Sequence, residues 1–286
     1  MAKIVDLLAA GRTSSFEFFP PKTDDAARAL EKTIAELQPL NPSFVSVTYG
    51  PGGSTRDRTR DIVIGIERNV GITAMAHLTC VAHTRVQLVD LLEEYKAAGI
   101  KNILALGGDV PQGMEDAPSE LEHALELVEL VKGVDDFSIG VAAHPELHPR
   151  SPDRTSDRKH LATKLLAADF GITQFFFTPE PYLRMVDELA ALGVTKPVLP
   201  GIMPVLNLAS VARMAELSGT AVPAEVLARF DPVADDPDAV RALGIELATE
   251  LCQDLLDAGA PGLHFYTLNR STATREIHTN LGLGDA

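Results

Sequence analysis

The stretch Ser15-Phe16-Glu17-Phe18-Phe19-Pro20-Pro21-Lys22 contains the first predicted strand and decides between two α/β architectures. Its apolar run ends in two prolines, which cannot continue a hydrogen-bonded strand. An open doubly wound sheet usually carries a glycine-rich G-x-G-x-x-G turn after its first strand, and this turn has no glycine. The stretch therefore favours a closed barrel over a dinucleotide-binding sheet.

The rest of the chain repeats a short apolar strand followed by an amphipathic helix. The predicted strands are Ser15–Phe19, Phe44–Tyr49, Thr73–Thr79, Asn102–Leu106, Ser138–Ala143, Ile172–Phe177, Val198–Ile202 and Leu263–Thr267. The predicted helices include Asp24–Leu37, Arg85–Ala98, Leu121–Val131, Ser156–Ala168, Tyr182–Leu192 and Ala239–Ala258. Residues 207–235 add an extra helical segment. Eight such units predict a single-domain α/β protein, a (β/α)8 TIM barrel over residues 1–286.

Composition narrows the class of protein. The 286 residues are 45% hydrophobic and 23% charged, as in ordinary globular proteins. A net charge of −15 disfavours nucleic acid and anionic membranes, and no basic run reverses it. Cys80 and Cys252 stand alone in apolar settings, which predicts buried thiols in a reducing compartment. Without a signal-peptide core or a membrane-length apolar segment, we expect a cytoplasmic protein; the sequence does not predict an oligomeric state.

Glu17 is a carboxylate inside an apolar strand. Burying an unpaired charge costs several kcal/mol, so the usual outcome is a raised pKa and a neutral acid that can donate a proton. Glu17 is therefore a candidate general acid. The alternative is an edge-strand glutamate that points into water.

Polar residues recur where the predicted strands end, at the face on which barrel enzymes place their active sites. They are Glu17, Thr48, His77, Asp109, the stretch His144-Pro145-Glu146-Leu147-His148, Gln174, Asn269 and Arg270. Strand seven contributes only backbone and a proline-rich turn. Because seven strands supply such a residue, we expect a shared cleft.

Gly107-Gly108-Asp109 ends the fourth strand. Paired glycines let a ligand approach the backbone closely, and Asp109 would point at that ligand. A plain turn with a helix-capping aspartate is the alternative.

Other charged residues follow the fifth strand. His144 and His148 flank Glu146 as metal ligands can, but their order is not H-E-x-x-H and Pro145 argues against a helix, so no metal site is predicted. Lys164 and Arg158 could meet a phosphate, or they could lie on a solvated helix face.

Five separated motifs together resemble the methylenetetrahydrofolate reductase family, nearly end to end and in the family's order. They are Ser15–Pro21, Phe44–Gly50, His77–Cys80, Ile172–Phe177 and His264–Arg270. The resemblance implies a (β/α)8 barrel that reduces 5,10-methylenetetrahydrofolate to 5-methyltetrahydrofolate with NADH or NADPH.

The resemblance also implies residue roles. Glu17 would be the acid that opens the substrate's five-membered ring, and Asp109 would stabilise the cation that develops. Gln174 and Thr48 would contact the substrate, with Arg270 suited to a carboxylate of its glutamate tail. The cofactor-binding positions carried over are Thr48, His77, Gly108, His144, Asp157 and Lys164.

The departures from the family lie where its members bind FAD as a hydride relay. Leu-Arg-Gly-Asp is Leu106-Gly107-Gly108-Asp109 here, His160 replaces an asparagine, and Thr163 replaces a basic residue. Each lost charge-assisted hydrogen bond is worth about 1.5–3 kcal/mol. This pattern predicts that FAD is absent and that the nicotinamide transfers hydride directly; the usual FAD-relayed route is the alternative.

Two other functions stay open. One is a metal-dependent barrel lyase or hydrolase that uses His77, His144, His148 and Asp109. The other is a barrel that binds folate or a nucleotide without catalysis. Retention of both Glu17 and Asp109 argues against a mere binder, which has little use for a buried acid.

Overall fold

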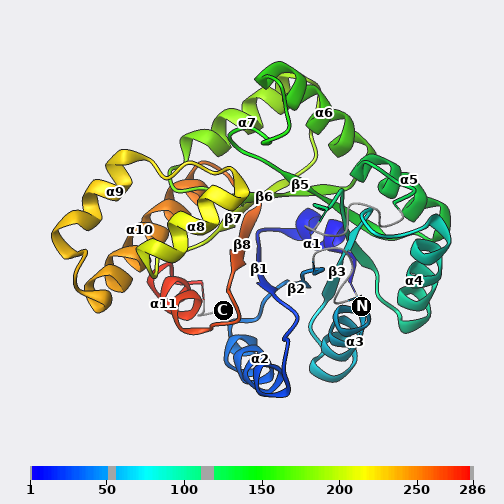
Figure 1. Ribbon diagram of the computed structural model, residues 1–286, viewed down its shortest axis with the longest axis horizontal. Coiled ribbons are helices and arrows are strands. Elements are labelled where there is room, and N and C mark those ends of the chain that lie inside the picture. Colours follow the sequence, from blue (N-terminus) through cyan, green and yellow to red (C-terminus); the bar gives the residue numbers. More distant parts are fainter. Residues whose placement is uncertain (1, 51–55, 111–118, 284–286) are drawn as a thin grey trace.

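Eight parallel strands close into one barrel, in a computed structural model that describes residues 2–50, 56–110 and 119–283. The strands are β1 Thr13–Phe18, β2 Phe44–Val47, β3 Ala74–Thr79, β4 Asn102–Leu106, β5 Ser138–Ala143, β6 Phe170–Phe175, β7 Val198–Ile202 and β8 Gly262–Tyr266. Neighbours in sequence are neighbours in space, and β1 pairs with β8 to close the cylinder (Figure 1). The predicted (β/α)8 TIM barrel is confirmed.

Helices surround the barrel (Figure 1). They are α1 Ile4–Ala10, α2 Asp24–Leu37, α3 Arg56–Gly65, α4 Arg85–Ala98, α5 Ala124–Val134, α6 Arg154–Ala167, α7 Glu180–Ala191, α8 Leu208–Ser218, α9 Ala224–Phe230, α10 Pro237–Asp257 and α11 Thr272–Asn280. Short helical turns follow α2 at Gln38–Leu40, α3 at Ile66–Val70 and α9 at Asp231–Val233. Within the described ranges, no helix is long and apolar enough to cross a bilayer.

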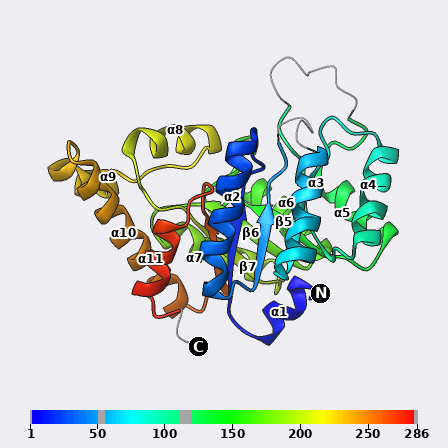
Figure 2. The same cartoon turned by 90° about the horizontal axis from the view of Figure 1, so that it is seen from below.

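Helix α1 lies under the barrel, at the end opposite α8 (Figure 2). Its backbone is tied to the strands, because the amide of Ile4 donates to the side-chain oxygen of Asn102 at 2.8 Å and the amide of Val5 donates to Ser138 Oγ at 3.1 Å. Ile4 itself is completely buried among apolar side chains of the barrel interior. These contacts close the lower end of the barrel.

The side chains inside the barrel change from apolar to polar along its axis. Its lower part is apolar and contains Phe44, Met75, Leu104, Phe170 and Leu199. Toward the carboxyl ends of the strands the interior becomes polar. Because the lower end is filled with apolar side chains, we expect a polar binding site at the upper end, where the strands have their carboxyl ends.

The element boundaries predicted from the sequence agree closely with those in the structure. Three strands and two helices match their predicted ranges, namely β4, β5, β7, α2 and α4. The other five strands begin or end one or two residues from the prediction. Residues 207–235 contain two helices, α8 and α9, where one extra helical segment was expected. Cys80 and Cys252 are buried and unpaired, as predicted.

A seam between the first and last strands is locked by Asn269. Its side-chain oxygen accepts from the amide of Phe19, and its side-chain nitrogen donates to the carbonyl of Phe19, both at 2.8 Å. Asn269 has a φ of 57°, in the left-handed region where asparagine is better tolerated than most residues. The polar residue at this strand end therefore joins two loops.

Candidate active site

A cavity of about 640 Å³ opens at the carboxyl ends of the strands. Its lining includes most of the predicted site residues: Glu17, Thr48, His77, Gly108, Asp109, His144, Lys164 and Gln174. The shared cleft predicted from strand ends is therefore present. Strand seven also supplies a side chain, because Met203 just after β7 lines the cavity.

Glu17 is buried in the barrel, with 6% of its surface exposed. The alternative of an edge-strand glutamate in water is wrong, because the closed barrel has no edge at β1. Its Oε2 lies 3.4 Å from Nε2 of both His77 and His264, and it accepts from Ser46 Oγ at 3.5 Å. One carboxyl oxygen thus has three polar neighbours from three strands.

His77 is a neutral neighbour of Glu17. Burial lowers the pKa of its imidazole to about 4, although the nearby Glu17 carboxyl opposes that shift. Its buried Nε2 approaches Glu17 without the geometry of a hydrogen bond, and it makes none elsewhere among the described residues. The nitrogen is therefore poorly satisfied, as is common where a ligand completes a site.

Gly108 has a φ of 83°, which only glycine adopts without strain. A Cβ there would lie 3.1 Å from Thr79 and 3.2 Å from Val81. The turn therefore needs its glycine, and it leaves Asp109 exposed at the rim of the cavity.

His144 and His148 form an edge-to-face pair with ring centroids 4.6 Å apart. Burial and the adjacent His148 and Lys164 lower the pKa of His144 to about 4, and burial also lowers that of His148. Both rings line the cavity. Among the described residues, no group of three histidine, cysteine or carboxylate side chains could hold a metal ion.

Lys164 reaches the cavity from α6. Its Nζ donates to the carbonyl of Ala142 at 2.6 Å, and burial lowers the pKa of the ammonium to about 8. Asp157 opposes that shift. Lys164 therefore supplies a cation to a largely desolvated wall, where its interaction with an anion would be strong.

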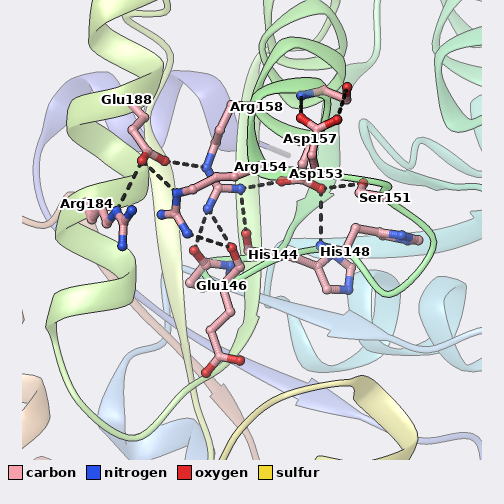
Figure 3. A network of polar contacts seen from close by, with 12 residues as sticks. His144, Glu146, His148, Ser151, Asp153, Arg154, Asp157, Arg158, Arg184 and Glu188 are labelled. Carbon is pink, nitrogen blue, oxygen red and sulfur yellow. Dashed lines mark hydrogen bonds and ion pairs between the residues drawn. The ribbon is translucent and has the colours of Figure 1, made fainter.

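Arg158 on α6 does not face the cavity as a free phosphate ligand (Figure 3). Its guanidinium donates to the carbonyls of His144, Pro145 and Glu146. It also bonds Asp157 and, at 2.8 Å, Glu188 on α7. All five of its N–H groups are thus engaged. Arg158 holds the loop between β5 and α6 in shape.

Asp157 has a similar structural position (Figure 3). Its Oδ1 accepts from the amide of His148 at 3.1 Å and from Ser151 Oγ at 2.7 Å, while Oδ2 bonds Arg158. Asp157 is 5% exposed and is not among the residues that line the cavity in the described chain. A direct contact of this carboxylate with a cofactor therefore gains no support, whereas a role in placing His148 does.

Arg270 is exposed just after β8 and, in the described part of the protein, does not line the cavity either. Gln174 does line it, with its side-chain oxygen accepting from the amide of Phe175 at 3.0 Å. This bond leaves the donor end of the Gln174 amide for a ligand. Met214 and Leu217 of α8 form an apolar wall, and Leu217 is 77% exposed.

One cation at the site was not predicted. A Cβ on Gly107 would lie 4.0 Å from Nη2 of Arg150, which comes from the loop between β5 and α6 and lines the same cavity. Arg150 thus brings a guanidinium close to a position where the family resemblance expects one from residue 107. The sequence carries no signal that Arg150 and Gly107 are close, because the two residues are 43 positions apart and meet only in the folded protein.

A larger hollow, of about 1140 Å³, lies outside the barrel between α2 and α3. It is lined by helix residues such as Leu30, Ile34 and Ile62. None of the predicted site residues lines it, so its size does not make it the active site.

Comparison with known proteins agrees with this geometry. A family model described as methylenetetrahydrofolate reductase matches residues 3–282. A 5,10-methylenetetrahydrofolate reductase from Pectobacterium carotovorum subsp. carotovorum is 40% identical over 270 residues, which cover 94% of this chain and 90% of the relative. The Escherichia coli (strain K12) protein of the same name is 39% identical over the same shares.

More distant relatives differ in length or only share the fold. A protein from Oryza sativa subsp. japonica, described as a probable methylenetetrahydrofolate reductase (NADH), is 37% identical over 98% of this chain and 50% of its own length. A solved Clostridium thermocellum protein, described as binding two copies of 5-methyl-5,6,7,8-tetrahydrofolic acid, superposes with a TM-score of 0.69 at 15% identity. It covers 98% of this chain and 97% of its own.

Proposed function

The chain belongs to the methylenetetrahydrofolate reductase family and is an oxidoreductase, and we propose that it reduces 5,10-methylenetetrahydrofolate with hydride taken directly from NADH. The observation that supports folate reduction is the position of Glu17, a buried carboxyl at the floor of the cavity. The observation behind the direct route is the departure from the family's flavin-binding pattern at Gly107 and Thr163.

Glu17 acts as the general acid. The methylene bridge of the substrate joins two nitrogens, and protonation of one nitrogen breaks its bond to the bridge and gives an electrophilic iminium ion. Glu17 supplies that proton and is left as a carboxylate. Water then returns a proton to it before the next turnover.

The other folate contacts follow from position. Asp109, at the rim, places a negative charge near the iminium ion and so stabilises it. The free donor end of Gln174 and the Thr48 side chain contact the pterin ring. Arg270, exposed beyond β8, meets a carboxylate of the glutamate tail outside the cavity.

NADH is a substrate with a diphosphate, and two described side chains suit that group. Lys164 and Arg150 line the cavity, and neither makes an ion pair within the described residues. His144 and His148 add neutral rings beside them. NADH supplies the hydride, and these residues hold its diphosphate with the nicotinamide toward the iminium carbon. The names of plant relatives such as the rice protein favour NADH over NADPH.

FAD would need the same wall, and the residues present fit it less well than the family pattern does. Position 107 has no side chain, Thr163 donates its hydroxyl to the carbonyl of Lys159 at 2.9 Å, and Arg158 has no free donor. Arg150 restores one cation, so the FAD-relayed route remains the second candidate. Both routes share the acid role of Glu17.

A flavin assay separates the two routes. Protein purified without added flavin is denatured, and the supernatant is examined by absorbance and fluorescence. We expect full NADH-dependent turnover from colourless protein with no released flavin. Stoichiometric FAD in the supernatant would refute direct transfer. Activity that appears only after FAD is added would refute direct transfer as well. Neither result would contradict the proposal that the protein reduces folate.

A further inference from the structure

His264 on β8 contacts Glu17 from beneath the cavity. The ring is completely buried, stacks on Phe44 at a centroid distance of 6.0 Å and meets the edge of Tyr266 at 5.5 Å. Its Nε2 lies 3.4 Å from Glu17 Oε2, within hydrogen-bonding geometry. His264 is not among the cavity-lining residues, so it can act on the substrate only through Glu17.

The other ring nitrogen of His264 is held by Ser15. Nδ1 lies 2.8 Å from Ser15 Oγ, and the same hydroxyl lies 3.2 Å from the carbonyl oxygen of Leu263. A carbonyl can only accept, so the hydroxyl hydrogen is needed there, and the hydroxyl oxygen then accepts from Nδ1–H. Only this arrangement makes both contacts of Ser15 at once. It places a ring hydrogen on Nδ1 and, in the neutral imidazole, leaves Nε2 as an acceptor.

An acceptor at Nε2 requires a donor opposite it. The group opposite is Oε2 of Glu17, which can donate only when the carboxyl is protonated. The groups that face Glu17 from the packed strands are Ser46, His77, His264 and Tyr266, and none of them carries a fixed positive charge. An ionised Glu17 would therefore face the Nε2 lone pair without a compensating cation.

From these contacts we propose that Ser15 and His264 are positioning residues that fix one tautomer of the imidazole and thereby keep Glu17 in its protonated, proton-donating form. In each turnover the O–H bond of Glu17 breaks and an N–H bond to the substrate forms. The Glu17 carboxylate then takes a proton from water, and His264 keeps its own hydrogen on Nδ1 throughout. The inference rests on the proposed acid role of Glu17.

The tautomer can be read directly by NMR. The protein has 8 histidines, and ¹⁵N-histidine labelling gives a pair of ring signals for each. The His264 pair is identified as the one missing from His264→Gln. We expect a protonated Nδ1 and an unprotonated Nε2 at neutral pH. A wild-type protein with its hydrogen on Nε2 would overturn the proposal.

Variants test whether the tautomer matters for turnover. Ser15→Ala removes the partner of Nδ1, and loss of one such hydrogen bond corresponds to a fall in kcat of about tenfold. We expect KM to stay the same, because Ser15 does not line the cavity, and the pH dependence of kcat to change. Ser15→Thr keeps a hydroxyl and should restore the parental pH profile.

The neighbouring residue gives a matched control. Ser14 also bonds a histidine, with its Oγ 2.8 Å from Nε2 of His278, but this pair makes no contact with Glu17. Ser14→Ala should therefore leave the pH profile of kcat unchanged. A folded Ser15→Ala with parental kcat and pH profile contradicts the proposal. Full activity in Glu17→Gln would instead refute the acid role itself, so the two failures are distinguishable.

Discussion

Glu17 combines burial with access to a ligand. The barrel surrounds it on three sides with Ser46, His77 and His264, yet it still lines the cavity. A carboxyl in such a place costs free energy that a purely structural residue would not justify. Its presence is best explained by chemistry on a bound molecule.

Glu17→Gln tests that explanation. The amide keeps the shape and some hydrogen bonding but cannot deliver a proton, so kcat for folate reduction should fall by about 10²–10⁴-fold. Substrate affinity should stay near the parental value. The rate of NADH oxidation with 5,10-methylenetetrahydrofolate measures kcat. Calorimetric titration with 5-methyltetrahydrofolate measures the folate affinity.

Glu31→Gln is the control, because Glu31 is exposed on α2 and is not among the described residues that line this cavity. It should turn over at the parental rate. If Glu17→Gln does the same, another group is the acid.

At this scale sequence predicted the residues that a strand end delivers to the cavity, such as Glu17, His77 and Gln174. It did not predict that Arg150 lines the cavity or that His264 contacts Glu17. Both depend on contacts between segments distant in the chain, and a strand pattern carries no information on which side chains meet across the barrel.

The loop between β5 and α6 shapes the side of the cavity that is lined by His144, His148 and Arg150. Arg158 binds three successive carbonyls of this loop and is itself bound to Asp157 and Glu188. The hydrogen bond from Arg154, together with the hydrogen bond from Arg158 and the positive charges of both arginines, lowers the pKa of Glu188 to about 2, although burial opposes the shift. The His144 and His148 rings are therefore held on a braced loop.

Arg158→Met should destabilise the protein strongly. It removes the cation beside the buried Asp157 carboxylate and a donor to the carbonyls of His144, Pro145 and Glu146, and breaking a buried ion pair in this way typically costs about 3–5 kcal/mol. Urea unfolding followed by circular dichroism measures the change in the free energy of unfolding.

Arg184→Met is the matched comparison, because Arg184 contacts the same Glu188 but its side chain is 65% exposed. We expect a loss within about 1 kcal/mol. Equal losses in the two variants would show that burial of Arg158 does not matter.

The helix pattern predicted α6 itself but not this network. Asp157 and Arg158 follow one another in the sequence, and a solvated helix face was an equally acceptable interpretation for the arginine. The structure distinguishes the alternatives because the loop folds back over the first turns of α6 and buries both side chains.

Three histidines make the stability of the whole molecule depend on pH. The pKa values of His77, His144 and His278 are all lowered to about 4, each mainly by burial. In an unfolded chain these groups titrate near 6.5. Between the two values the unfolded state binds more protons, so the free energy of unfolding falls as the pH decreases from about 6.5 to about 4.

The expected loss is large. Each pKa unit corresponds to about 1.4 kcal/mol, so three such histidines together account for a loss on the order of 10 kcal/mol, comparable to the stability of a whole domain. We predict that urea midpoints decrease steadily from pH 6.5 to pH 5, as measured by circular dichroism.

His278→Gln should make this decrease shallower, because one of the buried histidines with a lowered pKa is removed. His160→Gln, exposed on α6, should keep the parental slope. A midpoint that does not change over this pH range in the parental protein would contradict the prediction.

The architecture was more predictable than the site. Apolar strands alternating with amphipathic helices define a (β/α)8 barrel, and closure leaves few other arrangements. The missed elements have weaker patterns: α1 and α9 are seven residues long, and α3 begins with a charged turn around Asp57. Their positions depend on tertiary contacts, as α1 does on Asn102 and Ser138.

The seam between β1 and β8 has a consequence for the order in which the protein becomes competent. Glu17 and His264 are 247 residues apart, and Asn269 joins the same two ends of the chain. A chain still emerging from the ribosome contains β3 to β6 long before β8 exists. The contact between Glu17 and His264 is thus completed last, and we expect a chain that ends before β8 to lack activity even where its other strands have assembled.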